Sequence, residues 1–233
     1  MNKNNTKSPN KVVETNKNFK HVMAMTLDPR TRHEGIIRCI TSRTGDLGVK
    51  GCVDRSELHK ISGSSLEHFE IGERLNFKNE DKIISELIKD GGDFIGLEDP
   101  DIWIDEKNDL MHVYFTIPIR KEHTITHLGH AQGKDLNSLT MTMPVLLAGE
   151  NNRAKEVSIA PLNSKGFRYN LIESSNHRGD FRYSTVQVAI AEDMGKSWKY
   201  GETVFHPGDH KIPWIAGHAS PGPLFSKDFI DVG

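Results

Sequence analysis

The sequence is poor in cysteine. Cys39 and Cys52 are the only two cysteines among 233 residues, which is too few for a disulfide framework, and their spacing matches no metal-ligand pattern. We expect two reduced, half-buried thiols, with a bond between neighbouring strands as the alternative. The cysteine content therefore excludes a small domain held together by disulfides.

Long apolar runs are missing as well. No stretch approaches the roughly 20 residues of a membrane-spanning helix, and residues 1–18 form a tract rich in Lys, Asn, Thr and Ser without the apolar segment of a signal peptide. These absences predict a soluble, cytoplasmic protein with no membrane partner and a disordered lead-in over residues 1–18. A secretion signal missing from an incomplete sequence is the alternative.

Charge of one sign is not in excess either. The 30 Lys and Arg residues against 32 Asp and Glu residues give a formal net charge of -2, so no nucleic acid partner is expected. Hydrophobic residues make up 36% of the chain, which favours thin sheets and long polar loops over a thick helical core. A chain of 233 residues fits one domain, which we expect over residues 19–233.

Short strands separated by turns recur along the chain. They form three units at residues 19–78, 79–150 and 151–208, and a partial unit follows at residues 209–233. Units of this kind, each a four-stranded antiparallel sheet, are typical of the blades of an all-β β-propeller. An open all-β sandwich is the competing fold.

Some details of these units are expected to be irregular. Residues 49–53 are interpreted as a third strand of the first unit, and residues 81–90 as a short helix or irregular connector. Because propellers close with about four to eight blades, we expect this sequence to be incomplete at its C-terminal side. Closure with another copy of the chain, as a homo-oligomer, is the alternative.

Residues 91–105 place acidic side chains at the start of a strand. A Gly-rich loop leads to Glu98 and Asp99, Pro100 stiffens the chain, and apolar and polar residues then alternate with the two-residue period of a strand. A polar turn at residues 106–109 and a β-branched and aromatic run follow. The two runs therefore predict a hairpin.

The turn at residues 191–198 resembles the Asp-box of sialidase-like propellers. In that motif an Asp caps the hairpin, a Gly adopts positive φ and a Trp packs under the turn, and Asp193, Gly195 and Trp198 stand in these places. The motif is structural and lies away from the active centre in those families. It supports blades and indicates little about chemistry.

A larger set of residues carries a family resemblance. Leu97-Glu98-Asp99-Pro100, a hydrophobic hairpin ending in Val113-Tyr114-Phe115-Thr116, and a later unit with Ser197-Trp198 together resemble the five-bladed propeller glycosidases. The sequence is most similar to the mannoside phosphorylases and hydrolases of glycoside hydrolase family 130, and next to the arabinosidases and xylosidases of family 43. The resemblance implies a five-bladed propeller, an oligosaccharide substrate, and a funnel-shaped sugar site lined by the starts of the innermost strands.

The resemblance also implies site residues. Counting back from the turn of each hairpin places Glu156 in the third unit where Asp99 lies in the second. These two are the implied catalytic pair, one donating a proton to the glycosidic oxygen and the other tuning its pKa or acting as base. Glu173 is a rival for Glu156, but it falls on a second strand and is expected further from the axis. The candidates for substrate binding are Glu98, Arg168, Trp214 and His218.

The first unit departs from the family 43 pattern. An aspartate base is implied there, but the matching place falls at residues 21–23, and Asp28 lies too close to the turn. The phosphorylases of family 130 use phosphate as nucleophile and do without this base, so inorganic phosphate is the implied co-substrate if the chain is a phosphorylase. Such a reaction needs cationic residues, for which the candidates are Arg38, Arg43, Arg168, His177, Arg178 and His218.

Twelve histidines raise the question of a metal site. His123, His127 and His130 are close in sequence, but this spacing gathers ligands only on a helix, and the segment is predicted as loop and strand. We therefore expect no transition metal and no cofactor, with an axial Ca²⁺ as a compatible addition. The sequence contains no nucleotide-binding loop and no nucleophile elbow.

The sequence as a whole predicts a glycoside hydrolase or phosphorylase that cleaves a terminal glycosidic bond, with Asp99 as the essential carboxylate. The alternative is a noncatalytic carbohydrate-binding or protein-binding propeller. The two differ in their pockets. An enzyme needs a second carboxylate within about 5 to 9.5 Å of Asp99, whereas a binding module presents aromatic and amide side chains.

Overall fold

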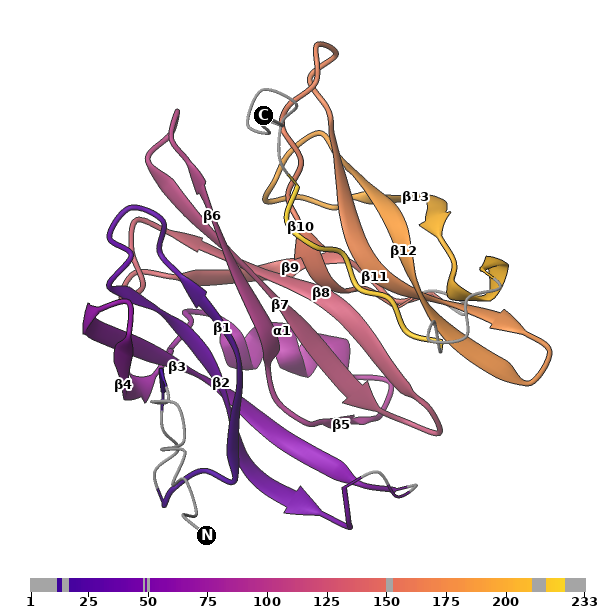
Figure 1. Ribbon diagram of the computed structural model, residues 1–233, viewed down its shortest axis with the longest axis horizontal. Coiled ribbons are helices and arrows are strands. Elements are labelled where there is room, and N and C mark those ends of the chain that lie inside the picture. Colours follow the sequence, from indigo (N-terminus) through magenta and orange to yellow (C-terminus); the bar gives the residue numbers. More distant parts are fainter. Residues whose placement is uncertain are drawn as a thin grey trace, which may run out of the picture.

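The fold consists of three antiparallel β-sheets that follow one another along the chain (Figure 1). They run in Figure 1 from the indigo sheet through the magenta one to the orange one. The predicted all-β fold of four-stranded antiparallel blades is confirmed. The computed structural model describes residues 12–13, 17–47, 49, 51–149, 153–210 and 217–224.

The first sheet has the strand order β1-β2-β3-β4. The central strand β2 is buried continuously from Gly35 to Ile40, because both of its edges are paired and both of its faces are covered. The strands are β1 (His21–Leu27), β2 (Glu34–Thr44), β3 (Val53–Ser65) and β4 (His68–Arg74).

The predicted third strand at residues 49–53 is wrong. The strand begins at Val53 and continues to Ser65, pairing with β2 along most of its length. Its sequence is largely polar, so the strand does not stand out. Leu58 and Ile61 are nevertheless buried, and pairing to the apolar β2 satisfies the backbone of the polar residues between them.

The second sheet has the order β5-β7-β8-β9, and β6 pairs with a further stretch of β7. Nine successive residues of β7 are buried, which explains why its sequence is an almost unbroken apolar and aromatic run. The hairpin predicted from residues 91–119 is the β6–β7 pair. The strands are β5 (Asp93–Phe94), β6 (Glu98–Asp105), β7 (Leu110–Arg120), β8 (Thr124–Gly133) and β9 (Thr140–Leu146).

A short helix, α1 (Glu80–Leu87), connects the first sheet to the second. It lies where a short helix or irregular connector was expected. Ile83 and Ile84 are buried in the same apolar cluster as side chains of β7, so the helix is held by one apolar face. Acidic residues in its first turn complement the positive end of the helix dipole.

The third sheet has the order β10-β11-β12-β13. Ser158 Oγ donates a hydrogen bond to the carbonyl of Gly222 at 2.6 Å, so residues 217–224 are tied to this sheet. The strands are β10 (Lys155–Ser158), β11 (Arg168–Arg178), β12 (Phe181–Ala191) and β13 (Lys199–Phe205), and a short 3-10 turn, η1 (Pro207–Asp209), follows.

Two apolar clusters join the sheets face to face. One contains Leu58 of the first sheet together with Val113 and Ile117 of the second. The other contains Tyr114 of the second sheet together with Ala189 and Trp198 of the third. The second sheet is therefore covered on both faces, as a blade inside a propeller is.

The innermost strands of the three sheets come together. β6 packs against both β1 and β10, and Figure 1 shows it running between the first and third sheets. β1 and β10 are the first strands of their sheets, and β6 is preceded in its sheet only by the two-residue strand β5. All three therefore occupy the place predicted for the innermost strand of a blade. Side chains at the starts of these strands can therefore share one site.

Three further expectations concern the two cysteines, a membrane-spanning helix and residues 1–18. Cys39 and Cys52 are both free, and burial raises the pKa of the Cys39 thiol to about 12. Among the described residues, no helix has the length and apolar character needed to cross a membrane. The lead-in predicted at residues 1–18 lies mostly outside the described residues, although the Val12 carbonyl accepts a hydrogen bond from the Phe69 amide at 2.8 Å.

Candidate active site

Each innermost strand carries a bulge with a residue in the left-handed region. The three residues are Ala24, Asp99 and Glu156, with φ values of 41°, 47° and 45°. In each case the pairing to the second strand shifts register at this point. Positive φ is unfavourable for residues other than glycine, and such strain is concentrated at functional positions. The repetition of one strained bulge in three blades marks a common site.

The three bulges line one pocket. Its volume is about 370 Å³, and its walls come from the three innermost strands. Asp99 and Glu156, the predicted catalytic pair, thus contribute to the same cavity, whereas the first blade contributes an alanine at the matching place. The lining residues are Ala24, Met25, Thr26, Asp99, Pro100, Asp101, Glu156 and Val157.

Arg38 of β2 holds both acidic residues at the start of β6. Its Nη1 lies 3.0 Å from Asp99 Oδ1, and its Nη2 lies 2.5 Å from Glu98 Oε1. The Nε also donates to Ser56 Oγ at 2.9 Å, so every side of the guanidinium is used. Arg38 was one of the cations considered for phosphate, but its charge is committed to these two carboxylates.

Opposing effects act on the pKa of the Glu98 carboxyl. Burial raises the pKa of its carboxyl, Arg38 lowers it and Asp99 raises it, and the net effect is an increase. Glu98 does not line the pocket. Its ion pair with Arg38 holds it beside Asp99, outside the cavity.

Lys155 lies among three carboxylates. Its Nζ is 3.3 Å from Glu156 Oε1, 3.5 Å from Glu173 Oε2 and 4.0 Å from Asp99 Oδ2. Burial lowers the pKa of this ammonium group, but the three carboxylates outweigh burial and raise it. Lys155 is therefore a charged bridge between the second and third blades. Sequence reasoning missed this role, because nothing in the residue's neighbours along the chain signals it.

Glu173 is the carboxylate that pairs with Lys155 from within the third sheet. It is fully buried, with 0% of its surface exposed. Arg153 Nη2 lies 2.7 Å from its Oε1, and Ser220 Oγ donates to its Oε2 at 2.6 Å. Glu173 was expected further from the axis than Glu156, and its contact with Lys155 nevertheless connects it to the pocket.

His218, predicted to bind substrate, lies close to this network. Its Nε2 is 3.4 Å from Glu173 Oε2, and more than half of its side-chain surface is exposed. Burial raises the pKa of Glu156, but Ser220, Lys155 and His218 together lower it below its usual value. The carboxyl of Glu156 is thus held as an ionised group.

Asp101 is a pocket residue that the sequence reasoning did not single out. Its Oδ1 accepts hydrogen bonds from the Ile102 amide at 3.0 Å and from Thr26 Oγ1 at 3.5 Å. Burial raises the pKa of its carboxyl, these two hydrogen bonds lower it, and the result is a pKa of about 6. The alternation of β6 was the available signal, since Asp101 lies two residues beyond Asp99 on that strand.

Arg168, another predicted binding residue, lies away from this pocket. Arg168 lines a second hollow of about 670 Å³, where its guanidinium stacks 4.8 Å above the ring of Trp103. Its Nη1 also donates to the Ala160 carbonyl at 2.6 Å. Trp214 lies outside the described residues.

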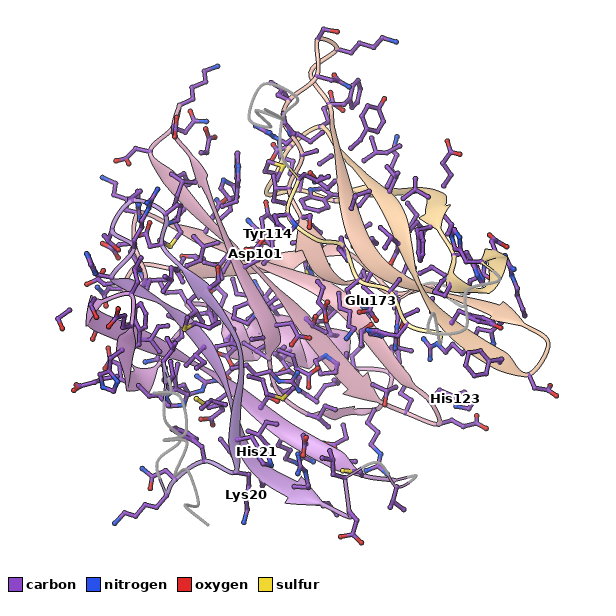
Figure 2. All side chains as sticks on the ribbon, viewed as in Figure 1. Lys20, His21, Asp101, Tyr114, His123 and Glu173 are labelled. Carbon is purple, nitrogen blue, oxygen red and sulfur yellow. The ribbon has the colours of Figure 1, made fainter. Side chains whose placement is uncertain are left out.

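Figure 2 shows the placement of labelled side chains around the junction of the sheets. Asp101 and Tyr114 lie close together on the second sheet where it faces the third, and Glu173 lies on the third sheet. His123 is far from them, at the end of the β7–β8 hairpin. The site is thus built at the junction of the blades.

Two of the three histidines considered for a metal site, His127 and His130, make hydrogen bonds. His130 Nε2 lies 2.9 Å from His112 Nδ1, and His130 Nδ1 lies 2.8 Å from Thr142 Oγ1. His127 Nδ1 accepts from the Ala148 amide at 2.8 Å. In the part of the chain that the structure describes, no three His, Cys, Asp or Glu side chains are grouped as metal ligands.

Comparison with known proteins gives similarity in structure but not in sequence. No family model matches the chain, and no curated protein matches it. Similar solved structures include a glycoside hydrolase with a TM-score of 0.53 and 14% identity, which aligns over 80% of this chain and 57% of its own. A beta-1,2-mannobiose phosphorylase from Listeria innocua, in complex with beta-1,2-mannobiose, has a TM-score of 0.51 and 14% identity over 82% of this chain and 60% of its own.

A GH32 beta-fructofuranosidase from Bombyx mori is similar at a TM-score of 0.50 and 12% identity, covering 78% of this chain and 34% of its own. At such identities the likeness establishes the fold, which is that of the propeller glycosidases. The chain spans 57% and 60% of the lengths of the first two structures. A shared fold does not determine activity, which depends on the residues of the site.

Proposed function

We propose that this protein is a glycosidase that cleaves a terminal glycosidic bond of an oligosaccharide in the pocket over Asp99, Asp101 and Glu156. The observation that carries the proposal is the convergence of these three carboxyl groups, from two neighbouring blades, on one cavity of about 370 Å³. Glycoside cleavage needs a carboxylic acid and a carboxylate on either side of one bond. The fold shared with glycoside hydrolases supports this assignment.

The chemistry follows from the charges of the pocket. A protonated carboxyl donates to the leaving oxygen as the glycosidic bond lengthens, and ionised carboxylates stabilise the positive charge that develops on the sugar ring. Arg38 and Lys155 hold Asp99 in place by ion pairs. Glu156, whose lowered pKa keeps it ionised, is available to accept a proton from the attacking molecule.

Water is the attacking molecule that the charge of the site favours. In the part of the chain that the structure describes, Arg38, Arg153 and Lys155 are already paired with carboxylates, so a phosphate dianion would meet net negative charge there. Ala24 supplies no base in the first blade, which leaves Glu156 for that role. The carboxylates of the surroundings are Glu98, Asp99, Asp101, Glu156 and Glu173, and the cations are Arg38, Arg153 and Lys155.

The binding-module alternative has less support in this pocket. Sugar-binding modules present aromatic faces and amides, whereas the lining residues that the structure describes include no aromatic or amide side chain. The nearby Trp103 faces the second hollow, and Arg168 covers one of its faces. A row of carboxyl groups fits acid chemistry better than passive binding.

The test is release of sugar from aryl glycosides and manno-oligosaccharides, with and without inorganic phosphate, by the full chain. Manno-oligosaccharides are included because the similar phosphorylase structure contains mannobiose. We expect free reducing sugar at a rate independent of phosphate, and a loss of about 10²-fold or more in Glu156→Gln. The matched control is Glu202→Gln, since Glu202 is exposed on the outer strand β13.

Each other outcome has a clear meaning. Sugar phosphate formed only with added phosphate would replace the hydrolase by a phosphorylase. Binding of sugars without turnover would replace both by the binding module. Equal activity of Glu156→Gln and the parent would remove Glu156 from the reaction.

A further inference from the structure

The acidic side chains around the pocket differ in their partners. Glu98 and Asp99 are ion-paired with Arg38, and Glu156 is ion-paired with Lys155. An ion pair with a cation favours the charged form of a carboxyl group. Glu156, whose pKa is lowered, is therefore held without a proton and is a poor proton donor. Asp99 lies against the positive charge of Arg38, and Glu98 lies outside the cavity.

Asp101 has a different environment. Among the described residues no salt bridge reaches it, and the Ile102 amide and Thr26 Oγ1 donate hydrogen bonds to it. Its carboxyl group is partly buried and lines the cavity. Burial without a cation favours the neutral, protonated form.

Within the described ranges, no cation from the elements packed around Asp101 forms an ion pair with it, and Arg38 of β2 pairs with Glu98 and Asp99 instead. From β1 the pocket receives Ala24, Met25 and Thr26, which are uncharged. From β10 it receives the carboxylate of Glu156, and from β7 the buried phenol of Tyr114 lies opposite in the register. Like charges nearby disfavour ionisation of Asp101 further.

We propose that Asp101 is the proton donor of the reaction, and that Asp99 and Glu156 act in their ionised forms. The inference rests on the proposed function. The carboxyl proton of Asp101 passes to the glycosidic oxygen while the bond from the anomeric carbon to that oxygen breaks, and the bonding electron pair stays with the leaving alcohol. The oxygen of water forms the new bond to the anomeric carbon, and Glu156 takes the proton that water loses. Solvent then returns a proton to Asp101 and removes one from Glu156.

Thr26 is part of this arrangement. Its hydroxyl lies 3.5 Å from Asp101 Oδ1 and reaches it from the first blade. The contact crosses from β1 to β6, so it favours one orientation of the donor between two blades. Thr26 is a positioning residue, because it acts on the substrate only through Asp101.

The experiment compares the parent with Asp101→Asn on two substrate types. One has a leaving group that needs protonation, such as an unactivated oligosaccharide, and the other is a dinitrophenyl glycoside that leaves without a proton. We expect Asp101→Asn to lose about 10²- to 10⁴-fold on the first and less than about 10-fold on the second. Asp99→Asn is expected to lose activity on both, because it removes charge stabilisation rather than a proton.

Two further readouts separate a donor from a structural residue. The alkaline limb of the pH profile of kcat is expected to disappear in Asp101→Asn. The carbon NMR signal of an Asp carboxyl that titrates near pH 6 in the parent is expected to vanish in the same variant. Asp105→Asn is the control, since Asp105 lies on the same strand but lines the second hollow.

The outcomes distinguish this inference from the proposed function. If the parent releases sugar and Asp101→Asn is impaired equally on both substrates, or on neither, the donor assignment is overturned while the glycosidase remains. If the parent cleaves no glycoside of either type, the proposed function fails and the donor assignment fails with it.

Discussion

Arg38 and Asp99 form an ion pair at 3.0 Å that joins the first blade to the innermost strand of the second. Arg38 comes from β2 and also reaches Glu98, so one guanidinium holds both acids that precede Pro100. Only 11% of the Arg38 side chain and 12% of the Asp99 side chain are exposed. The pair is thus a link between two sheets at the edge of the pocket that Asp99 lines.

Replacing Arg38 should cost much stability. In Arg38→Met the side chain keeps most of its length, but Glu98 and Asp99 lose their nearest counter-charge and Asp99 is left with Lys155 at 4.0 Å. This loss is expected to lower the free energy of unfolding by about 3 to 5 kcal/mol. Urea denaturation of the two proteins measures the difference. The matched control is Arg55→Ala, whose ion pair with Asp93 is 47% exposed on both sides and should cost at most about 1 kcal/mol. Equal costs for the two variants would show that the Arg38 pair is no stronger than a surface pair.

Gly96 allows the loop before β6 to approach β3. Its φ is +120°, and a Cβ added there would lie 1.9 Å from the backbone oxygen of Ser56. Gly96→Ala should therefore displace β6 and break the backbone hydrogen bonds around Ser56, at a cost of at least about 2 kcal/mol. Gly149→Ala is the control, because a Cβ at Gly149 meets nothing within 4 Å. Thermal unfolding that is unchanged in Gly96→Ala would contradict the close approach.

Trp198 tests the structural interpretation of the Asp-box, in which Asp193 caps the turn as expected but Gly195 lacks the expected positive φ. The side chain is 4% exposed, its Nε1 donates to the Asp193 carbonyl at 3.1 Å, and its ring lies 5.2 Å from that of Tyr114. Trp198→Ala is expected to lose about 3 to 5 kcal/mol of stability, and Trp198→Phe less, because it keeps most of the apolar contact. Activity per folded molecule should be unchanged in Trp198→Phe. A loss of kcat there, with stability retained, would assign this turn a part in the chemistry.

His130 should make stability depend on pH. Burial lowers its pKa to about 3, so the folded state resists a proton that the unfolded chain binds below about pH 6.5. Its contribution to stability is present above pH 6.5 and is lost as the pH falls towards 3. Between pH 6.5 and 5 the loss amounts to about 1 to 2 kcal/mol for this residue.

The comparison of the parent with His130→Gln isolates this contribution. Asp101, with its raised pKa, has the opposite sign, since its contribution is lost as the pH rises from about 3.9 through 6. That contribution is present in both proteins and cancels in the difference. Urea denaturation at pH 6.5 and 5 should show a smaller decrease for His130→Gln. An equal decrease in both proteins would mean that His130 is not kept neutral by the fold.

The hairpin and the place of its acids could be predicted from local signals. Alternation predicted the run that became β6, and the apolar run after the turn became β7. Counting back from the turns placed Glu156 at the same level as Asp99, and the structure shows both in strained bulges that line one pocket. The count in the first blade gave residues 21–23, whereas the bulge lies at Ala24.

The contacts between blades could not be predicted in this way. Lys155 and Glu173 meet because β10 and β11 pair, and Lys155 reaches Asp99 only because β10 packs beside β6. Such contacts depend on how sheets face one another, which no periodicity along the chain encodes. For the same reason the long polar strand β3 was missed, since its pairing to β2 rather than its own sequence makes it a strand.

The most direct test of the central claim is the rate of sugar release by Asp99→Asn relative to the parent, on the same oligosaccharide, with folding checked by urea denaturation. Asp105→Asn serves as the control on the same strand, outside the pocket. The account predicts that Asp99→Asn folds and loses about 10²-fold or more of the parent rate, while Asp105→Asn stays within about 3-fold. A folded Asp99→Asn protein that cleaves the sugar as fast as the parent would contradict the account and place the reaction elsewhere on the molecule.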